Sequence, residues 1–330
     1  MGVSGTLVKR GAASLALAAV VCGGIWSPAF AQDADLAALT GEIVSDGSST
    51  VGPITQAIAE EFNSAAPNVK TSVDISGTGG GFERFCKGET DVQNASRPIK
   101  DEEAAACAAA GIKYLEFEVA YDGLTVVVNE NNTFINCLNL AALKLLWQKE
   151  NPAMTWVDLN PAWPAEPIAL YGPGTDSGTF DYFVETVLGK DGEIREDFTP
   201  SEDDNVLVEG VANDENALAY FGHAYYEENQ DLLNAVAVDG GNGCVEPTTE
   251  SVRDGSYAPL SRPLFVYVKE ASLARPEVQE FMKFYIENAP EIAPEVGFVA
   301  SPDETYMADA AELETALAAA PAEAAATPAS

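Results

Sequence analysis

The chain has 330 residues, of which 47% are apolar, and a formal net charge of −35 at pH 7. This length and apolar fraction suffice for one large or two medium domains with cores of their own. The negative charge argues against nucleic acid or an anionic membrane surface as a partner. An anionic ligand would have to be held by local dipoles and hydrogen bonds, because charges more than about 8 Å away are screened at physiological salt.

The first 31 residues have the pattern of a secretory signal peptide. A basic start at residues 9–10 precedes an apolar run over residues 12–25, and the cleavage signature AFA ends at residue 31. A membrane anchor is the alternative, but the apolar run is short for a span. We therefore expect an exported, periplasmic protein whose mature chain begins at Gln32.

Short β-type runs alternate with helical runs along the mature chain. In residues 53–63, for example, Ile54, Ile58 and Phe62 fall on one helical face. This alternation predicts an α/β fold with largely parallel sheets. The strand candidates are residues 41–44, 69–75, 124–129, 167–171 and 264–268, and the other helix candidates are residues 82–88, the residues after 179, and residues 276–288.

Four cysteines lie in the expected mature chain, namely Cys86, Cys107, Cys137 and Cys244. An even number of cysteines in an exported protein suggests two disulfides. Three pairings are possible, and in one of them Cys86 joins Cys107 over a short loop and leaves Cys137 for Cys244. The spacings contain no C-x-x-C pair and the chain has a single histidine, so we expect neither a metal nor a cofactor.

Three strand candidates end in a loop rich in glycine, serine and threonine, each followed by a helix. These loops are residues 47–51, 77–81 and 172–179. In open α/β sheets such loops gather at the carboxyl ends of the strands, beside the ligand crevice. Glycine lets a helix N-terminus approach a ligand closely, and the hydroxyls add donors. Each loop alone is most often a turn with a helix cap, but the three together predict an anion site.

A fourth segment, TDVQNASRPI, places Ser96 and Arg97 before a proline and hence in an extended or turn conformation. The common role of such an arginine is a solvated surface group. Its fork of donors nevertheless suits a tetrahedral oxyanion better than any other side chain. Arg97 is therefore a candidate ligand-binding residue.

Five segments together resemble the periplasmic phosphate-binding proteins of bacterial phosphate ABC transporters. They are DGSSTVGPIT, SGTGGGFERFCKGETDVQNASRPI, LYGPGTDSGTFDYF, SEDDNVLVEGV and PLSRPLFVYV. The resemblance implies a bilobed type II periplasmic-binding-protein fold, with two doubly wound α/β lobes joined by hinge strands. We expect lobe 1 to comprise residues 32–121 and 260–311 and lobe 2 to comprise residues 122–259. Residues 312–330, rich in Ala, Pro and Glu, are expected to be a disordered tail or a weak helix.

The resemblance also implies which residues bind phosphate between the lobes. Matched motif by motif, they are Ser49, Thr50 and Val51; Thr78 and Gly79; Ser96 and Arg97; and Ser177, Gly178 and Thr179.

The chain departs from the family pattern at two of these motifs. Many relatives have an arginine near the position of Pro173 and an aspartate where Arg97 aligns, so the positive charge is expected to come from the other lobe. The missing aspartate leaves open which group accepts the proton of phosphate and thereby rejects sulfate. Asp46 and Asp176 are hypotheses for that acceptor.

The expected function is capture of inorganic phosphate and its delivery to the membrane permease of a phosphate ABC transporter, by a monomer without enzymatic activity. Binding of a related oxyanion such as sulfate, arsenate or molybdate is an alternative, and a surface or adhesion protein is another. A secreted phosphatase with Ser177 as nucleophile is less favoured. Such a serine needs a base, and His223 lies in an aromatic-rich stretch that indicates a packed residue.

Overall fold

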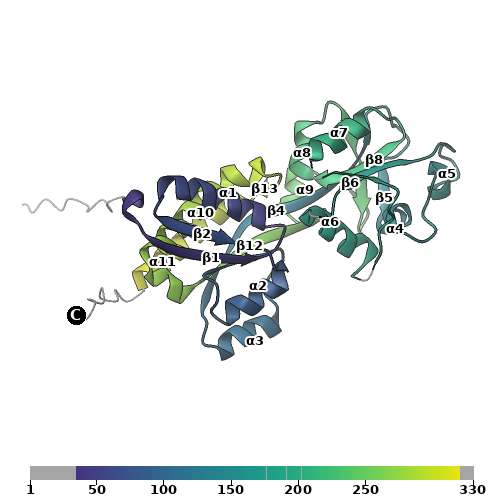
Figure 1. The fold of residues 1–330 in the computed structure, drawn as a ribbon. Coiled ribbons are helices and arrows are strands. Elements are labelled where there is room, and N and C mark those ends of the chain that lie inside the picture. The colour runs from purple at the N-terminus through teal and green to yellow at the C-terminus, as the bar shows by residue number, and fades with distance from the viewer. Residues whose placement is uncertain (1–34, 176, 191, 202, 320–330) are drawn as a thin grey trace, which may run out of the picture. The chain divides into compact units, whose positions relative to one another are not determined.

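A computed structural model describes residues 35–175, 177–190, 192–201 and 203–319 of the chain (Figure 1). The expected signal peptide and residues 320–330 of the expected tail lie outside these ranges. Within them, no helix is both long and apolar enough to cross a bilayer.

The main sheet of the described residues has ten strands, with the path β2-β1-β3-β12-β4-β8-β6-β7. Two short strands, β9 and β13, pair with β4 beside this path, and β11, β10 and β5 form a separate sheet. The strands are β1 (Gly41–Gly47), β2 (Val69–Val73), β3 (Val92–Ala95), β4 (Tyr114–Asn129), β5 (Cys137–Asn139), β6 (Ala169–Pro173), β7 (Thr199–Ser201), β8 (Ala217–Gly222), β9 (Leu233–Ala235), β10 (Ala237–Asp239), β11 (Cys244–Val245), β12 (Ser261–Lys269) and β13 (Val299–Ala300).

The prediction of largely parallel pairing is correct for the outer strands and wrong for the centre of the sheet. β1 is parallel to β2 and β3, and β6 is parallel to β7 and β8. β12 and β4, however, run antiparallel to each other and to their neighbours β3 and β8. β4 is also much longer than predicted, because its first half pairs with β12 and its second half with β8.

Helices cover both faces of the part of the sheet formed by β1, β2, β3 and β12. α1 (Gly52–Ala65) and α10 (Pro276–Glu295) lie on one face, and α2 (Gly77–Cys86) and α3 (Asp101–Ala109) on the other (Figure 1). The alternation along β12 matches these two layers: Leu264, Val266 and Val268 join the core under α1 and α10, whereas Phe265 and Tyr267 join the core under α2 and α3. The segment LFVYV is thus apolar on both sides, as in a buried strand.

A second pair of cores lies around β6, β8 and the second half of β4. Leu218 and Tyr220 of β8 pack with α4 (Leu140–Trp147) and α6 (Gly178–Phe183), whereas Ala219 and Phe221 pack with α7 (Asp204–Ala212). A π-helical turn, η2, continues α6 over Val184–Leu188. The remaining helices of this region are α5 (Trp156–Leu159), α8 (His223–Glu228) and α9 (Thr249–Arg253), and two 3₁₀ turns elsewhere are η1 (Leu36–Ala38) and η3 (Glu270–Ala274).

The four predicted disulfide cysteines form two bonds. Cys86 joins Cys107 and so links the end of α2 to α3. Cys137 of β5 joins Cys244 of β11, across a sequence separation of 107 residues.

Of the two alternatives for the segment from residue 312, a disordered tail or a weak helix, residues 312–319 are helical and complete helix α11 (Asp303–Ala319). Leu313 is buried in the same core as α10, and the Tyr306 hydroxyl donates to the carbonyl of Val119 in β4 at 2.7 Å. The alanine-rich composition concealed these few anchoring residues.

Asp309 is a buried carboxylic acid on the inner side of α11. Burial raises its pKa to about 7, and the nearby carboxylates of Glu118, Glu312 and Glu116 add to the rise. The folded state therefore binds a proton that the unfolded chain, with an ordinary pKa near 4, has already lost at pH 6.

Because the folded-state pKa is raised, Asp309 destabilises the fold increasingly as the pH rises from about 4 to about 7. We expect Asp309→Asn to raise the free energy of unfolding by about 2 kcal/mol at pH 8 and to leave it nearly unchanged at pH 4. Urea unfolding at both pH values measures the difference. An equal effect at the two pH values would contradict the proposed titration.

Candidate functional site

A polar cavity of about 640 Å³ lies where the Gly/Ser/Thr loops of three strand-to-helix junctions meet. Thr50 comes from the β1–α1 loop, Thr78 and Gly79 from the start of α2, and Gly178 from the start of α6. Ser96 and Arg97 follow β3 and line the same cavity. Segments far apart in the sequence are thus brought together, as the loop pattern predicted.

The first loop is held by the buried side chain of Ser48 and by its contact with β3. Ser48 is buried, and its hydroxyl accepts from the amides of Thr50 and Val51 at 3.1 and 3.4 Å. Gly47 has φ +136°, and a Cβ there would lie 2.2 Å from the carbonyl oxygen of Asn94. Only glycine fits this position, which brings the loop against β3.

The second loop is tied to the segment that carries Ser96. Thr78 Oγ1 lies 3.1 Å from the Ser96 hydroxyl and accepts from the Ser96 amide at 3.2 Å. Gln93 of β3 donates through Nε2 to the Thr78 carbonyl at 3.0 Å. These bonds fix the donors at the start of α2 relative to those of the segment that carries Ser96.

The third loop meets the first across the cavity. A Cβ on Gly178 would lie 2.7 Å from Thr50 Oγ1 and 2.9 Å from the Thr50 amide nitrogen. The start of α6 therefore touches Thr50 directly, and a larger residue at position 178 would separate the two loops.

Arg262 of β12 brings a guanidinium to this contact. Its Nη2 donates to Thr50 Oγ1 at 3.0 Å, and its Cζ lies 3.7 Å from the centroid of the Tyr182 ring. Nε and Nη2 both donate to Oδ2 of Asp122, at 3.2 and 3.1 Å. Arg262 and Asp122 are partners in the β12–β4 register, so the pair joins the two central strands of the sheet.

The two members of this ion pair differ in exposure. The Asp122 side chain is 1% exposed and that of Arg262 is 19% exposed. Burial raises the pKa of Asp122, although the positive charge of Arg262 opposes that rise. Part of the guanidinium remains accessible from the cavity while its other edge is fixed by the carboxylate.

Two acidic side chains also line the cavity, Asp181 of α6 and Glu185 of η2. The pKa of Asp181 is raised, mainly by burial and also by the negative charge of Glu185, although the positive charge of Arg262 opposes the rise. The cavity therefore contains donors of several kinds together with carboxylates that can accept a proton.

A family model described as a PBP superfamily domain matches residues 33–289. Protein SphX of Synechococcus elongatus is 48% identical over 269 residues, which cover 81% of this chain and 79% of that protein. The phosphate-binding protein PstS of Staphylococcus saprophyticus is 43% identical over 304 residues, with 92% and 91% covered. The chain belongs to the PstS-like family of phosphate-binding proteins. This confirms the family indicated by the sequence.

Solved structures agree with this membership of the PstS-like family. A possible phosphate-binding protein from Planctomyces limnophilus superposes with a TM-score of 0.81 at 48% identity, and 84% of this chain and 99% of that chain are covered. A putative phosphate ABC transporter substrate-binding protein from Clostridium perfringens, determined with bound phosphate, has a TM-score of 0.53 at 28% identity, with 79% and 100% covered. The α/β fold of the bilobed type II class is thereby confirmed.

Most of the residues that the PstS-like motifs single out line the cavity. The lining includes Ser49, Thr50, Thr78, Gly79, Ser96, Arg97 and Gly178. It does not include Val51, whose side chain is buried in the core beside α1, nor Ser177 or Thr179. The Ser177 hydroxyl instead accepts from the Thr179 amide at 3.2 Å and caps α6.

Arg97 lines the cavity with its guanidinium already paired. Nη1 and Nη2 each lie 2.8 Å from a different carboxylate oxygen of Glu103. The same Glu103 carboxylate accepts from the Lys100 amide at the start of α3. Arg97 is thus bound to α3 in this structure, whereas Arg262 is bonded to a loop hydroxyl that lines the cavity.

The cavity is also lined by residues that the sequence motifs did not single out, namely Arg262, Asp181, Tyr182 and Glu185. For Arg262 a signal was present, because the tripeptide Ser-Arg-Pro that drew attention to residues 96–98 recurs at residues 261–263. The other three follow the Ser-Gly-Thr motif, with Asp181 and Tyr182 in α6 and Glu185 in η2. Only the direction of α6 and η2 shows that they reach the cavity.

The two aspartates suggested as proton acceptors have different outcomes. Asp46 is buried and does not line the cavity, whereas Asp176 lies outside the described residues. His223 is buried, as expected for a packed residue. Its Nδ1 lies 3.0 Å from Thr125 Oγ1 and its Nε2 lies 3.3 Å from the Glu227 carboxylate. Burial lowers the pKa of His223.

The ion pair at the cavity gives a prediction about stability. Removing Arg262 leaves the buried Asp122 carboxylate without its cation, and breaking one side of such a pair is costly. We expect Arg262→Met to lower the free energy of unfolding at pH 7 by about 3 kcal/mol, and by less at pH 4, where Asp122 is more readily protonated.

The variant Asp122→Asn/Arg262→Met, which removes both charges, should recover most of the loss in urea unfolding at pH 7. If the double variant is no more stable than Arg262→Met, the pair does not act through charge compensation.

Proposed function

We propose that this chain is an exported solute-binding protein that captures inorganic phosphate in the cavity and delivers it to the membrane permease of a phosphate ABC transporter. The observation that carries the proposal is the meeting of hydroxyl and glycine loops with the guanidinium of Arg262. The relatives named as phosphate-binding proteins support phosphate as the anion.

The proposed ligand contacts are local, as the acidic chain requires. Free hydroxyls and helix-start amides can surround the oxygens of a tetrahedral anion, and a guanidinium adds charge-assisted bonds. We propose that Arg262 and the motif residues Ser49, Thr50, Val51, Thr78, Gly79, Ser96, Arg97, Ser177, Gly178 and Thr179 form this shell. The amides of Val51 and Thr179 would then exchange their present bonds to the hydroxyls of Ser48 and Ser177 for bonds to the anion.

The proposed lobes follow the boundaries expected from the sequence. One lobe comprises residues 32–121 and 260–311, and the other comprises residues 122–259. Support comes from the apolar cores: one contains Ile43, Phe117 and Phe281, and another contains Leu124, Leu146 and Tyr257. β4 and β12 would then be the hinge strands, with Asp122 and Arg262 where the hinge meets the cleft.

We propose Asp181 as the group that accepts the phosphate proton. Its carboxyl lies in the cavity near the positive charge of Arg262. An ionised Asp181 would accept a hydrogen bond from monohydrogen phosphate and repel sulfate, which carries no proton at neutral pH.

We propose a binding role without catalysis, for a protein that acts as a monomer and contacts no nucleic acid. A phosphatase using Ser177 would need a base, whereas His223 is buried, lies against Thr125 and Glu227, and does not line the cavity. Hydrolysis of a chromogenic phosphate ester that follows the pure protein would contradict this.

Isothermal titration with phosphate, sulfate, arsenate and molybdate tests the proposal. The wild-type protein should prefer phosphate to sulfate, and Arg262→Gln should weaken phosphate binding about 10- to 100-fold, since one charge-assisted contact is lost. Arg97→Gln should weaken it less, because Glu103 already holds that guanidinium. Asp181→Asn should narrow the gap between phosphate and sulfate.

The proposal fails if the folded wild-type protein binds none of these anions, or binds sulfate as tightly as phosphate. A larger loss of phosphate affinity for Arg97→Gln than for Arg262→Gln would show that Arg97 is the main cation of the site.

A further inference from the structure

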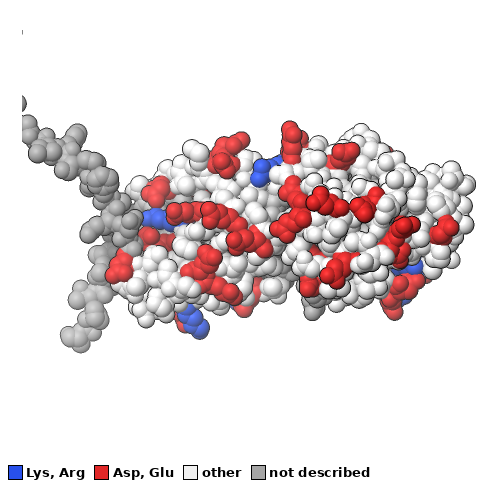
Figure 2. Space-filling model, turned by 90° about the horizontal axis from the view of Figure 1, so that it is seen from above, with Lys and Arg blue, Asp and Glu red and all other residues white. Residues whose placement is uncertain are grey.

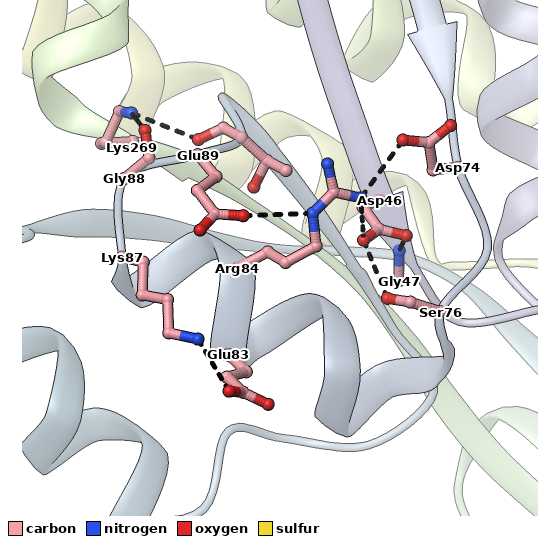
Figure 3. Close-up of polar contacts among 11 residues, drawn as sticks. Asp46, Gly47, Asp74, Ser76, Glu83, Arg84, Lys87, Gly88, Glu89 and Lys269 are labelled. Carbon is pink, nitrogen blue, oxygen red and sulfur yellow. Dashed lines mark hydrogen bonds and ion pairs between the residues drawn. The ribbon is translucent and has the colours of Figure 1, made fainter.

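A buried carboxylate lies directly behind the loops that line the cavity. Asp46 is in β1, two residues before Ser48, and is fully buried. Figure 3 shows the donors around it: the Gly47 amide at 2.7 Å, the Ser76 hydroxyl at 2.8 Å and Nη1 of Arg84 at 2.7 Å. A buried charge needs such partners, because it has lost its hydration.

The bond from Ser76 changes how helix α2 begins. Ser76 is the residue before the helix, where a serine hydroxyl commonly accepts from the first amides. Here the hydroxyl donates to Asp46 and makes no cap bond to α2. Gly77, Thr78 and Gly79, the first residues of α2, line the cavity, and their amides receive no cap bond from the Ser76 side chain. At α6, by contrast, the Ser177 hydroxyl does cap the helix.

Arg84 supplies the positive charge opposite Asp46. It lies in the last turn of α2, and its side chain is 36% exposed. The guanidinium also lies 3.2 Å from Asp74 and 3.4 Å from Glu89, so one cation faces three carboxylates (Figure 3). Without Arg84, these negative charges would stand uncompensated beside a site proposed for an anion.

The backbone around Asp46 leaves little room for adjustment. A Cβ on Gly81 of α2 would lie 2.6 Å from the Gly47 Cα and 2.2 Å from Gln93 Oε1. Helix α2 therefore packs directly on the first loop. The bonds from Ser76 and Arg84 to Asp46 join helix α2 to the first loop beside this glycine contact.

We infer that the Asp46–Arg84 ion pair is a positioning device for the anion site. Asp46 keeps the Ser76 hydroxyl away from the α2 amides and ties the first loop to the second, and Arg84 neutralises Asp46 so that the anion is not repelled. Neither residue lines the cavity. The inference rests on the proposed function, because it assigns a role to residues behind the same site.

The test is titration of phosphate into four folded variants beside the wild-type protein. Arg84→Gln leaves Asp46 uncompensated, and the Kd should rise about tenfold. Asp46→Asn/Arg84→Gln removes both charges with nearly unchanged shape and should return the Kd to within about threefold of the wild-type value. Asp46→Asn alone completes the cycle.

Lys87→Gln is the matched control, because Lys87 lies beside Arg84 at the end of α2 and pairs at 2.7 Å with the exposed Glu83. It removes one positive charge from the same region and should leave the Kd within about twofold of wild type. Circular dichroism melting of each variant without phosphate reports its folded fraction.

Recovery in the double variant separates compensation of charge from general loss of structure, since both variants lack the arginine. The inference is overturned if Arg84→Gln binds phosphate as the wild-type protein does, or if the double variant is as weak as Arg84→Gln. It is also overturned if Lys87→Gln is equally weak. A wild-type protein that binds no phosphate would instead refute the proposed function.

Discussion

The ion pair between Arg262 and Asp122 joins the two central strands of the sheet to the cavity. Asp122 is buried and fixes one edge of the guanidinium, while Nη2 also bonds to Thr50 in the first loop. Tyr182 from α6 lies against the same guanidinium. One side chain therefore contacts elements from residues 50, 122 and 182, and the arrangement of the cavity depends on where it is held.

The electrostatics of the site are local because the chain as a whole is acidic. Figure 2 shows one face of the molecule with many Asp and Glu side chains and few Lys and Arg. With a net charge of −35, the protein as a whole repels an anion. Short-range donors and compensated carboxylates must overcome that repulsion. The structure places an arginine against each of two buried aspartates near the cavity, Arg262 against Asp122 and Arg84 against Asp46.

Local sequence patterns predicted the loops of the site, but they could not predict which distant side chains form ion pairs. Gly/Ser/Thr runs at strand-to-helix junctions predicted Thr50, Thr78 and Gly178 as site residues, because the conformation and donors of each loop depend on consecutive residues. The partner of Arg97 could not be deduced, and Arg262 was passed over although it has the same Ser-Arg-Pro context. Both arginines are paired with an acid, Arg97 with Glu103 and Arg262 with Asp122, and which acid holds each one depends on strand register and helix position.

In the fold, too, the features set by local sequence could be predicted and those set by distant contacts could not. An apolar run predicted β12 and helical periodicity predicted α1. The antiparallel direction of β4 and β12 depends instead on the path of the chain between these two strands. The sequence left both a disordered tail and a weak helix open from residue 312, since the docking of α11 rests on few apolar residues such as Leu313 in an alanine-rich background.

A crystal structure of the protein with bound phosphate tests the central role of Arg262 most directly. We predict a phosphate oxygen about 3 Å from the Arg262 guanidinium, with Asp122 still bonded to its other edge and Arg97 still paired with Glu103. Phosphate bound to an Arg97 released from Glu103, without contact to Arg262, would contradict it.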